Sequence, residues 1–588
     1  MKKSNDKNIS EVQKWFLRSV SFEDKPYTID LEQARTVVDD SENLIVTARA
    51  GSGKTRTIVA KIIYLVARCG IRPDDIMAFV FNANAAQEIN TRLGKMRVDG
   101  EEIIKDAKIA NTFHAFSRKV VYDWCGGKEK CKEILAEKKD DLLNLIMRQL
   151  VLEEEWRDVI KRFLLNGDDS EAMSSLWEDS NYLETELERL AKEVSQFVNR
   201  AQQQYLGSGT SLNESTRKYL GTHNVEEREE LFIKIGTECY DRYHRYLLNS
   251  EGLRDFSEYG TDFNLIVSWA AKLIQERRGL TVEKLQQKKY LLIDEYQDFS
   301  QLFLYEVFAI RSVAVEAKLF VVGDDLQAIN RFAGSEVGFF KNFEKVFGDD
   351  SKRLVLSTNY RCGYEIVDVA RCFMKKAMRE KGSFRAFSHR AGEVVLVDLN
   401  MIEMKLAMTD YDCRVSEEDK RYLEICKKML GHTPKITTMR YLKVLVEIIK
   451  KNYLAKDIMI LDRNNEMAVE RINLERLGEG LKECLGDFGA MNGAEIGQKL
   501  KIMTMHKSKG LEAEVVIIIE ADEGVIPRVH PDTKLFSIFG ENDEVTLEDQ
   551  KRLFYVAITR AKKKLYIIYS GKTRGGFVKY LGRGVEKW

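Results

Sequence analysis

Short runs of apolar and β-branched residues recur along the chain, separated by longer segments with helical periodicity. The first set is LIVTA (44–48), IMAFVF (76–81), KIANTF (108–113), YLLID (290–294), LFVVG (319–323) and LVLST (354–358). The second set is VVLVDL (394–399), IMIL (458–461), KIMTM (501–505), VVIII (515–519) and KLYIIY (564–569). Strands of parallel sheets that are buried on both faces have this pattern. The sequence therefore predicts an α/β protein.

One long segment departs from this alternation. From about residue 116 to 289 there is no convincing buried strand, while charged helical periodicity is strong, as in DDLLNLIMRQLVLEEEWRDVIKRFLL (140–165). We expect an all-helical insertion over 116–284, with GSGTSLNES (207–215) as a loop inside it. A smaller charged break at 400–435 predicts a second insertion.

The stretch ARAGSGKTRT (48–57) directly follows the first apolar run. Glycines at this spacing let backbone N–H groups converge on an anion, Lys54 adds a charge, and the Thr55 hydroxyl can ligate Mg²⁺. The pattern starts with alanine where the usual motif has glycine, and a helix-capping turn is the alternative. The strand pattern before it and the helical pattern after it favour a site for a nucleoside triphosphate.

Acidic and amide side chains follow two of the predicted strands. YLLIDEYQDFS (290–300) places Asp294 and Glu295 at the end of a buried run, where a carboxylate pair is costly unless it meets a cation. We expect Asp294 to ligate Mg²⁺ and Glu295 to orient the attacking water as a base, the alternative being carboxylates that point into solvent. LFVVGDDLQAINRFAGSE (319–336) repeats the design with Gln327, which can contact both a phosphate oxygen and water.

Taken in order, these motifs resemble those of the UvrD/Rep family of superfamily 1 helicases, with details most similar to its helicase IV-like members. In the first half, six segments resemble, in this order, the family's adenine-reading motif, its phosphate-binding motif, its two DNA-contacting motifs, its magnesium motif and its coupling motif. They are LEQARTVV, ARAGSGKTR, AFVFNANAAQEINTRL, NTFHAF, IDEYQD and GDDLQAINRFAG. LSTNYRC, TMHKSKGLEAEVV and RLFYVAITRA resemble the later motifs. The resemblance extends from about Leu31 to Tyr569.

The resemblance implies two RecA-like P-loop lobes with ATP and Mg²⁺ between them. It assigns Gln33 and Tyr360 to the adenine and Glu512 to the ribose, and it makes Arg361 and Arg560 arginine fingers. Guanidinium groups stabilise a transferring phosphoryl group only when they are close, so hydrolysis would require lobe closure. The expected catalytic residues are Lys54, Glu295, Gln327, Arg361 and Arg560; the expected nucleotide contacts also include Ala50, Gly51, Ser52, Gly53, Lys54, Thr55 and Arg56.

A track for single-stranded nucleic acid needs aromatic faces for bases and polar or basic groups for phosphates. The candidates are Phe81, His114, Phe332 and His506, although a phenylalanine after a strand more often belongs to a core. Several positions depart from the family pattern. Val80-Phe81-Asn82-Ala83 stands where the family has T-F-T-N and so lacks two hydroxyls, Asn330 and Ala333 remove a ring and a cation, and Arg49 replaces a small residue. Weaker base stacking is expected.

Composition narrows the picture only slightly. The 588 residues include 93 basic and 93 acidic side chains, so a nucleic-acid surface must be a local groove and cannot be a general basic coat. The nine cysteines are scattered without a C-x-x-C pair, which argues against a zinc or iron–sulfur site. No apolar run is long enough to cross a bilayer, and the expected location is cytoplasmic, without a membrane partner.

These observations predict a first RecA-like lobe over 1–115 and 285–356, and a second over 357–588. The second would carry small insertions near 400–435 and 465–500 and lack most of the family's accessory subdomain. The expected function is ATP-dependent 3′-to-5′ translocation on single-stranded or tailed duplex DNA, together with unwinding of the duplex. The alternatives are an ATPase subunit that works with a separate nuclease, for instance in phage defence, a non-catalytic nucleic-acid scaffold, and an RNA helicase. The helical insertion is the expected surface for a protein partner.

Overall fold

The computed structural model describes most of the chain. The described residues are 2–105, 108–133, 136–166, 177, 179–248, 260–380, 382, 384–387, 391–398, 453–454, 457–463, 501–529, 531–569, 576–582 and 586–587. They form two compact units. The first comprises Met1–Ala48, Lys54–Leu356 and His530–Asp543, and the second comprises Arg49–Gly53, Ser357–Val529 and Glu544–Trp588. The insertions predicted near 400–435 and 465–500 lie outside the described residues.

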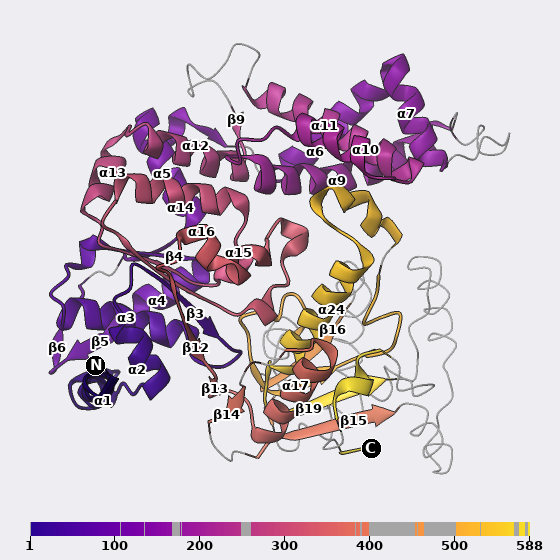
Figure 1. Ribbon diagram of the computed structural model, residues 1–588. Coiled ribbons are helices and arrows are strands. Elements are labelled where there is room, and N and C mark those ends of the chain that lie inside the picture. Colours follow the sequence, from indigo (N-terminus) through magenta and orange to yellow (C-terminus); the bar gives the residue numbers. More distant parts are fainter. Residues whose placement is uncertain are drawn as a thin grey trace, which may run out of the picture. The chain divides into compact units, whose positions relative to one another are not determined.

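The first unit is built on a six-stranded parallel sheet (Figure 1). Its order is β12 (Lys352–Leu356), β3 (Asn43–Ala48), β11 (Lys318–Gly323), β10 (Tyr290–Ile293), β4 (Ile76–Val80) and β7 (Ala110–Thr112). Each strand overlaps one of the predicted apolar runs, with β3 and β11 starting one residue earlier and β12 two residues earlier than predicted. Strands β3, β10 and β4 are buried throughout. The α/β class with parallel sheets is therefore confirmed.

Helices cover both faces of this sheet. Successive strand residues point to opposite sides, so the apolar strands present hydrophobic side chains on both faces. One hydrophobic core joins Leu44, Val46 and Val80 to residues of α1 (Lys2–Ser19), α2 (Leu31–Val38), α3 (Lys54–Ala67) and α4 (Ala83–Lys95). The other joins Ile45 and Phe79 to α5 (Phe113–Cys125), α12 (Phe263–Gln275) and α14 (Gln301–Val313). Short helices α13 (Leu280–Glu283), α15 (Val337–Lys341) and α16 (Phe343–Phe347) complete these layers.

A small antiparallel sheet, which the sequence pattern does not predict, also belongs to the first unit. Its order is β2 (Lys25–Pro26), β1 (Val20–Phe22), β5 (Met96–Val98) and β6 (Glu101–Glu102). These strands are two or three residues long, too short to produce a recognisable alternation.

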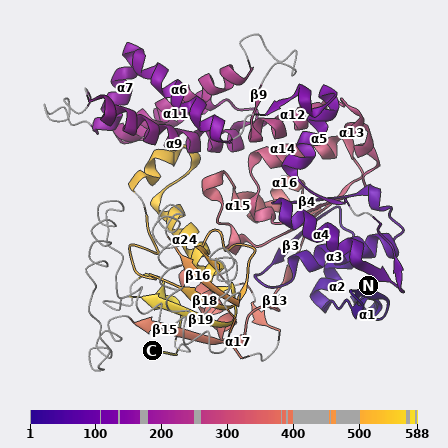
Figure 2. The same cartoon turned by 180° about the vertical axis from the view of Figure 1, so that it is seen from behind.

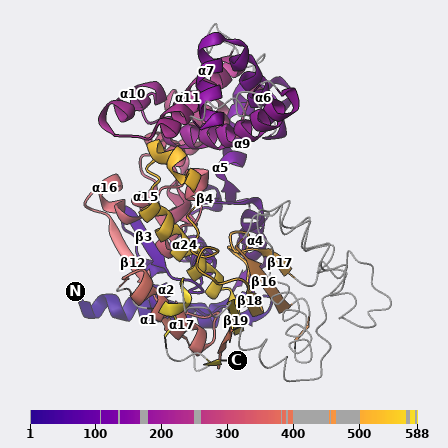
Figure 3. The same cartoon turned by 90° about the vertical axis from the view of Figure 1, so that its right-hand side faces the viewer.

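The segment between β7 and β10 is dominated by helices (Figure 3). They include α6 (Ala136–Leu152), α7 (Glu154–Leu165), α9 (Ser180–Tyr205), α10 (Leu212–Thr222) and α11 (Glu227–Leu248). A separate core lies among them and includes Met147, Phe163 and Phe197. Two-residue strands β8 (Lys132–Glu133) and β9 (Gly260–Thr261) also pair here. Part of the predicted loop 207–215 is helical, because Ser211 caps α10 by accepting the Glu214 N–H.

The second unit contains another six-stranded parallel sheet, with β15, β18 and β19 visible in Figure 2. Its order is β17 (Lys501–Thr504), β16 (Ile458–Asp462), β18 (Ala513–Ile518), β19 (Ala561–Tyr569), β15 (Glu393–Asp398) and β20 (Glu586–Lys587). Strands β13 (Thr358–Asn359) and β14 (Arg385–Ala386) form a separate pair. Helices α17 (Tyr364–Ala377) and α24 (Asp543–Ile558) belong to this half of the chain. Among the described residues, no helix has the length and apolar character needed to cross a bilayer.

Candidate functional site

The carboxyl ends of β10 and β11 bring the predicted residues Asp294 and Glu295 together with Asp324, which was not predicted as a site residue. Asp294 and Glu295 follow β10, and Asp324 follows β11, which is its parallel neighbour. Lys54 is the first residue of α3, and its Nζ lies 2.9 Å from Glu295 Oε2. The structure thus places the expected base beside the phosphate-loop lysine.

The charged groups at this edge of the sheet shift one another's pKa values. Burial alone would lower the pKa of the Lys54 ammonium, but the charges of Glu295, Asp324 and Asp294 raise it above its ordinary value. Burial, together with the nearby Glu295 charge, raises the pKa of Asp294 to about 7. A buried carboxyl with a raised pKa is a group that gains from a nearby cation. Carboxylate and hydroxyl oxygens suit Mg²⁺, so Asp294 and Thr55 fit the ion that the sequence predicts.

Gln297, which the sequence analysis did not select, connects the two acidic loops. Its amide nitrogen donates to Glu295 Oε2, and its Oε1 accepts the Asp324 N–H at 2.9 Å. A Cβ on Gly323 would lie 2.5 Å from Gln297 Oε1, so glycine is needed there. Gln327 extends the network, because its amide donates to Asp324 Oδ2 at 2.6 Å. The signal for Gln297 in the sequence is a neutral amide directly after an acidic pair at a strand end.

Glu295 itself has a strained backbone. Its φ is 51°, in the left-handed region that glycine favours. It precedes the short 3-10 helix Tyr296–Asp298, and the Asp298 N–H donates back to its carbonyl at 2.9 Å. Strain of this kind persists only where surrounding contacts impose it, and it is concentrated at functional sites.

The phosphate-loop residues Arg49–Gly53 are grouped with the second unit. The Asn359 amide donates to the Ala50 carbonyl at 2.8 Å, and the Tyr360 N–H donates to the Gly51 carbonyl at 2.8 Å. Gly51 has a φ of 70°, and a Cβ there would lie 2.8 Å from the Asn359 side chain. Within the loop, the Ser52 N–H donates to the Arg49 carbonyl at 3.0 Å. Asn359, another residue that the sequence analysis missed, therefore fixes the loop backbone.

The two predicted arginine fingers have different surroundings in the second unit. Arg361 Nε donates to Glu512 Oε2 at 2.7 Å, and Lys562 Nζ lies 2.7 Å from the other oxygen of the same carboxylate. Burial tends to raise the pKa of Glu512, but Lys562 and Arg361 lower it below its ordinary value. Arg560 is almost fully buried, and it donates to the carbonyls of Val556 and Leu511. Glu512, the predicted ribose contact, and Arg361, a predicted phosphate contact, are thus paired with each other.

The residues predicted to contact adenine lie in separate local networks. Gln33 is buried at 2% exposure, and its Oε1 accepts the Asp30 N–H in a capping box at the start of α2. The Tyr360 ring lies 4.6 Å from the exposed ring of Phe387, measured between centroids. Arg56 lies over the Tyr27 ring and donates from Nε to the Thr28 carbonyl at 2.8 Å.

The candidate DNA contacts differ in exposure. Phe81 and Phe332 are 46% and 52% exposed, so neither ring is a core residue. His114 is stacked against Phe263, with ring centroids 3.4 Å apart, and Phe263 is 50% exposed. Burial and the Arg118 charge lower the pKa of His114 to about 3, and its ring is neutral at ordinary pH. Phe263, missed by the sequence analysis, is the exposed ring of that pair.

His506 follows β17 in the second unit. Burial, assisted by the Arg463 and Lys509 charges, lowers its pKa to about 4, so it is also a neutral ring at ordinary pH. The Lys509 N–H donates to the His506 carbonyl at 3.2 Å, which closes a tight turn after the strand. The turn holds the imidazole and the lysine on adjacent backbone.

Comparisons with known proteins agree with these motifs. The family described as the UvrD/REP helicase N-terminal domain matches residues 29–348, and the UvrD-like helicase C-terminal domain matches residues 420–572. DNA helicase IV of Escherichia coli K12 is 25% identical over 93% of this chain and 69% of its own length. A probable DNA helicase of Mycoplasma pneumoniae is 24% identical over 92% of this chain and 83% of its own. The ATP-dependent DNA helicase PcrA of Leuconostoc citreum is 22% identical over 91% and 81%.

Proposed function

Because the chain belongs to the UvrD/REP helicase family, we propose that this ATP-dependent DNA helicase translocates 3′ to 5′ along single-stranded DNA and unwinds tailed duplexes. The observation that carries the proposal is the network at the ends of β10 and β11. Lys54, Glu295, Gln297, Asp324 and Gln327 join there in one chain of ionic and hydrogen-bonded contacts. Such a chain holds a base, a phosphate-binding cation and a coupling amide in fixed geometry.

Lys54, Glu295 and Gln327 have proposed roles in hydrolysis, and Gln297 and Asp324 hold Glu295 and Gln327 in place. Lys54 and the loop 50–53 bind the phosphates, and Glu295 orients the attacking water and accepts its proton. The ion pair with Lys54 keeps Glu295 in place until phosphates compete for the lysine. Asp294 and Thr55 would hold Mg²⁺, which would neutralise charge on the phosphate oxygens. Gln327 contacts the γ-phosphate or the attacking water. Through this contact, the presence of the γ-phosphate affects the loop that follows Gln327.

The remaining nucleotide contacts are proposed from the second unit and the chain start. Arg361 and Arg560 act as arginine fingers, for which Arg361 must exchange its Glu512 partner for a phosphate oxygen. The Glu512 oxygen released in this way, Oε2, can accept from the ribose while Oε1 stays paired with Lys562. Gln33 and Tyr360 contact the adenine, and Arg56 supports that end of the site through Tyr27.

The proposed architecture follows the predicted division of the chain. Residues 1–115 with 285–356 and residues 357–588 form two RecA-like lobes, and 116–284 is a helical insertion in the first. The second lobe has only a reduced accessory insertion. Phe81, His114, Phe332 and His506 lie on the proposed DNA track, where the exposed rings of Phe81 and Phe332 stack with bases. The helical insertion is the proposed site for a protein partner.

Steady-state ATP hydrolysis tests the function. The unsubstituted protein is measured alone and with single-stranded DNA, duplex DNA and RNA. We expect strong stimulation by single-stranded DNA and at least a hundredfold loss of turnover in Lys54→Ala and Glu295→Gln, with ATP binding retained in the latter. Glu316 is an exposed carboxylate outside the network, and the variant Glu316→Gln serves as the matched control.

Three results would contradict the proposal. Turnover close to that of the unsubstituted protein in either variant would show that the site is elsewhere. Hydrolysis that no nucleic acid stimulates would favour a scaffold or a partner-dependent ATPase, and stronger stimulation by RNA would change the substrate class.

A further inference from the structure

A segment that the sequence assigns to the second lobe packs with the first unit. Residues 530–543 are grouped with that unit, and the 3-10 helix η9 (Pro531–Phe539) packs against α11. Leu535, Phe536 and Ile538 are buried in the core of the helical segment. The segment is therefore an integral part of the first unit.

Ion pairs with Arg228 of α11 and with Glu226, which directly precedes that helix, hold the start of this segment. Arg228 Nη1 lies 2.8 Å from Asp532 Oδ1, and Lys534 Nζ lies 2.6 Å from Glu226 Oε1. Most of these side chains are well exposed, as in ordinary surface pairs that add little stability. They secure the segment without contacting the coupling motif.

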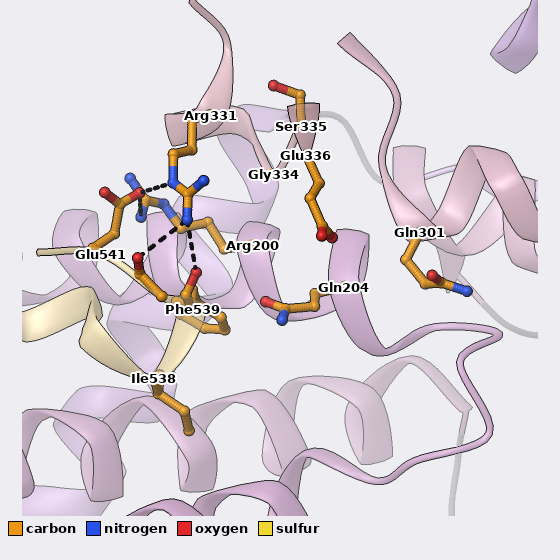
Figure 4. A pocket seen from close by; sticks show the side chains of 11 residues that line it. Arg200, Gln204, Gln301, Arg331, Gly334, Ser335, Glu336, Ile538, Phe539 and Glu541 are labelled. Carbon is orange, nitrogen blue, oxygen red and sulfur yellow. Dashed lines mark hydrogen bonds and ion pairs between the residues drawn. The ribbon is translucent and has the colours of Figure 1, made fainter. Parts of the chain in front are cut away.

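The end of the segment has a different contact. Glu541 Oε1 lies 2.8 Å from Arg200 Nη1 and 3.4 Å from Arg331 Nε (Figure 4). The side chains of Glu541 and Arg200 are only 8% and 10% exposed, so solvent screens this pair weakly. Arg331 Nη2 also donates to the Gly540 carbonyl at 3.1 Å. We call Glu541, Arg200 and Arg331 the Glu541 latch.

Two latch residues, Arg331 and Glu541, lie along the chain between the predicted site residues Gln327 and Arg560. Arg331 starts the 3-10 helix Arg331–Ala333, four residues after Gln327, and Arg200 Nε donates to the carbonyl of Phe332 at 3.1 Å. Glu541 precedes α24 by two residues, and α24 ends at Ile558, two residues before Arg560. This sixteen-residue helix therefore begins next to the latch residue Glu541 and ends next to the predicted site residue Arg560.

We propose that Glu541 is a positioning residue for DNA-stimulated ATP hydrolysis. Through Arg331 it couples movement of the Gln327 loop to α24, and hence to the setting of Arg560. The inference rests on the proposed function, because it assigns the latch to the DNA-stimulated step. Arg200 ties the same carboxylate to α9 of the helical segment, so the state of that segment also affects the coupling.

The test compares Glu541→Gln and Arg331→Met with the matched control Asp532→Asn, all in the full-length protein. Asp532→Asn weakens docking of the same segment but leaves the latch intact. We expect Glu541→Gln to lower the DNA-stimulated kcat about tenfold while the basal rate and the KM for ATP stay within about twofold. Asp532→Asn is expected to match the unsubstituted protein. Arg331→Met leaves the Arg200–Glu541 pair in place and provides a second variant should Glu541→Gln fold poorly.

The double variant separates coupling from general damage. If Glu541 acts through Arg331, the double variant loses no more stimulated turnover than the more affected single variant. Additive losses, or equal losses in Glu541→Gln and Asp532→Asn, would overturn the latch. If the unsubstituted protein shows no DNA stimulation, the proposed function fails and the latch fails with it; intact stimulation in Glu541→Gln refutes the latch alone.

Discussion

At the residue scale, Glu306 shows how far burial changes an ionisable group. It lies on α14 with no exposure, and burial raises its pKa to about 8. Ser117 Oγ lies 2.7 Å from Glu306 Oε1 and 2.7 Å from the Phe113 carbonyl, yet its hydroxyl has one proton. A protonated Glu306 resolves this conflict, because the carboxyl proton can be shared with Ser117 while the hydroxyl serves Phe113.

This residue gives a pH-dependent prediction. Between the ordinary pKa of about 4.5 and the folded value of about 8, the unfolded chain releases a proton that the folded protein keeps, so stability falls as pH rises through this window. Glu306→Gln cannot ionise, and its thermal midpoint should gain on that of the unsubstituted protein by a few degrees between pH 5 and pH 8. Exposed Glu316→Gln is the control. A constant difference across this range would contradict the assignment.

Phe263 offers a second residue-scale prediction, on nucleic-acid binding. Its exposed ring covers the neutral His114 and lies 5.5 Å from the Arg118 guanidinium carbon, a combination that suits base stacking. Phe263→Ala should weaken single-stranded DNA binding roughly tenfold, because stacking on one ring contributes about 1–3 kcal/mol. Phe308→Ala, which removes another exposed ring of the first unit, should bind as before. Fluorescence anisotropy with a labelled oligonucleotide measures both, and equal affinities would remove Phe263 from the track.

At the element scale, the phosphate loop shows what sequence and structure each contribute. Its glycines, its lysine and the flanking strand and helix were predicted from spacing alone, because backbone geometry around an anion restricts those positions. Asn359 could not be predicted in this way, because its contact with Ala50 joins residues about 300 positions apart. Gln297 was missed for the opposite reason, since it lies inside a recognised motif where the acidic pair drew the chemical argument.

Gly51 provides the element-scale prediction. Gly51→Ala meets both a positive φ of 70° and a contact of 2.8 Å with Asn359, whereas Gly70→Ala meets a similar φ of 67° in open space. Both variants should lose about 1 kcal/mol of stability from the backbone conformation. Only Gly51→Ala should lower kcat/KM for ATP, by tenfold or more, because its loop must shift. Thermal denaturation and steady-state kinetics distinguish the two costs, and unchanged kcat/KM in Gly51→Ala would show that the close approach is dispensable.

At the scale of the whole molecule, the parallel sheets were predictable, but the boundaries of the compact units were not. Apolar runs identified every strand of the first parallel sheet, because strands buried on both faces leave a continuous pattern. The chain order of the motifs gave no sign that residues 530–543 pack with the first unit. That contact depends on the fit of Leu535, Phe536 and Ile538 to a helical core, which no local periodicity encodes.

The burial of these three side chains has a consequence for synthesis. The helices from α6 to α11 leave the ribosome nearly 300 residues before Leu535 does, an interval of roughly 15–60 seconds at 5–20 residues per second. During that time the apolar face that will receive η9 has no covering segment from its own chain. The nascent protein therefore carries an exposed apolar surface that is a natural target for chaperones, and slowed translation prolongs its exposure.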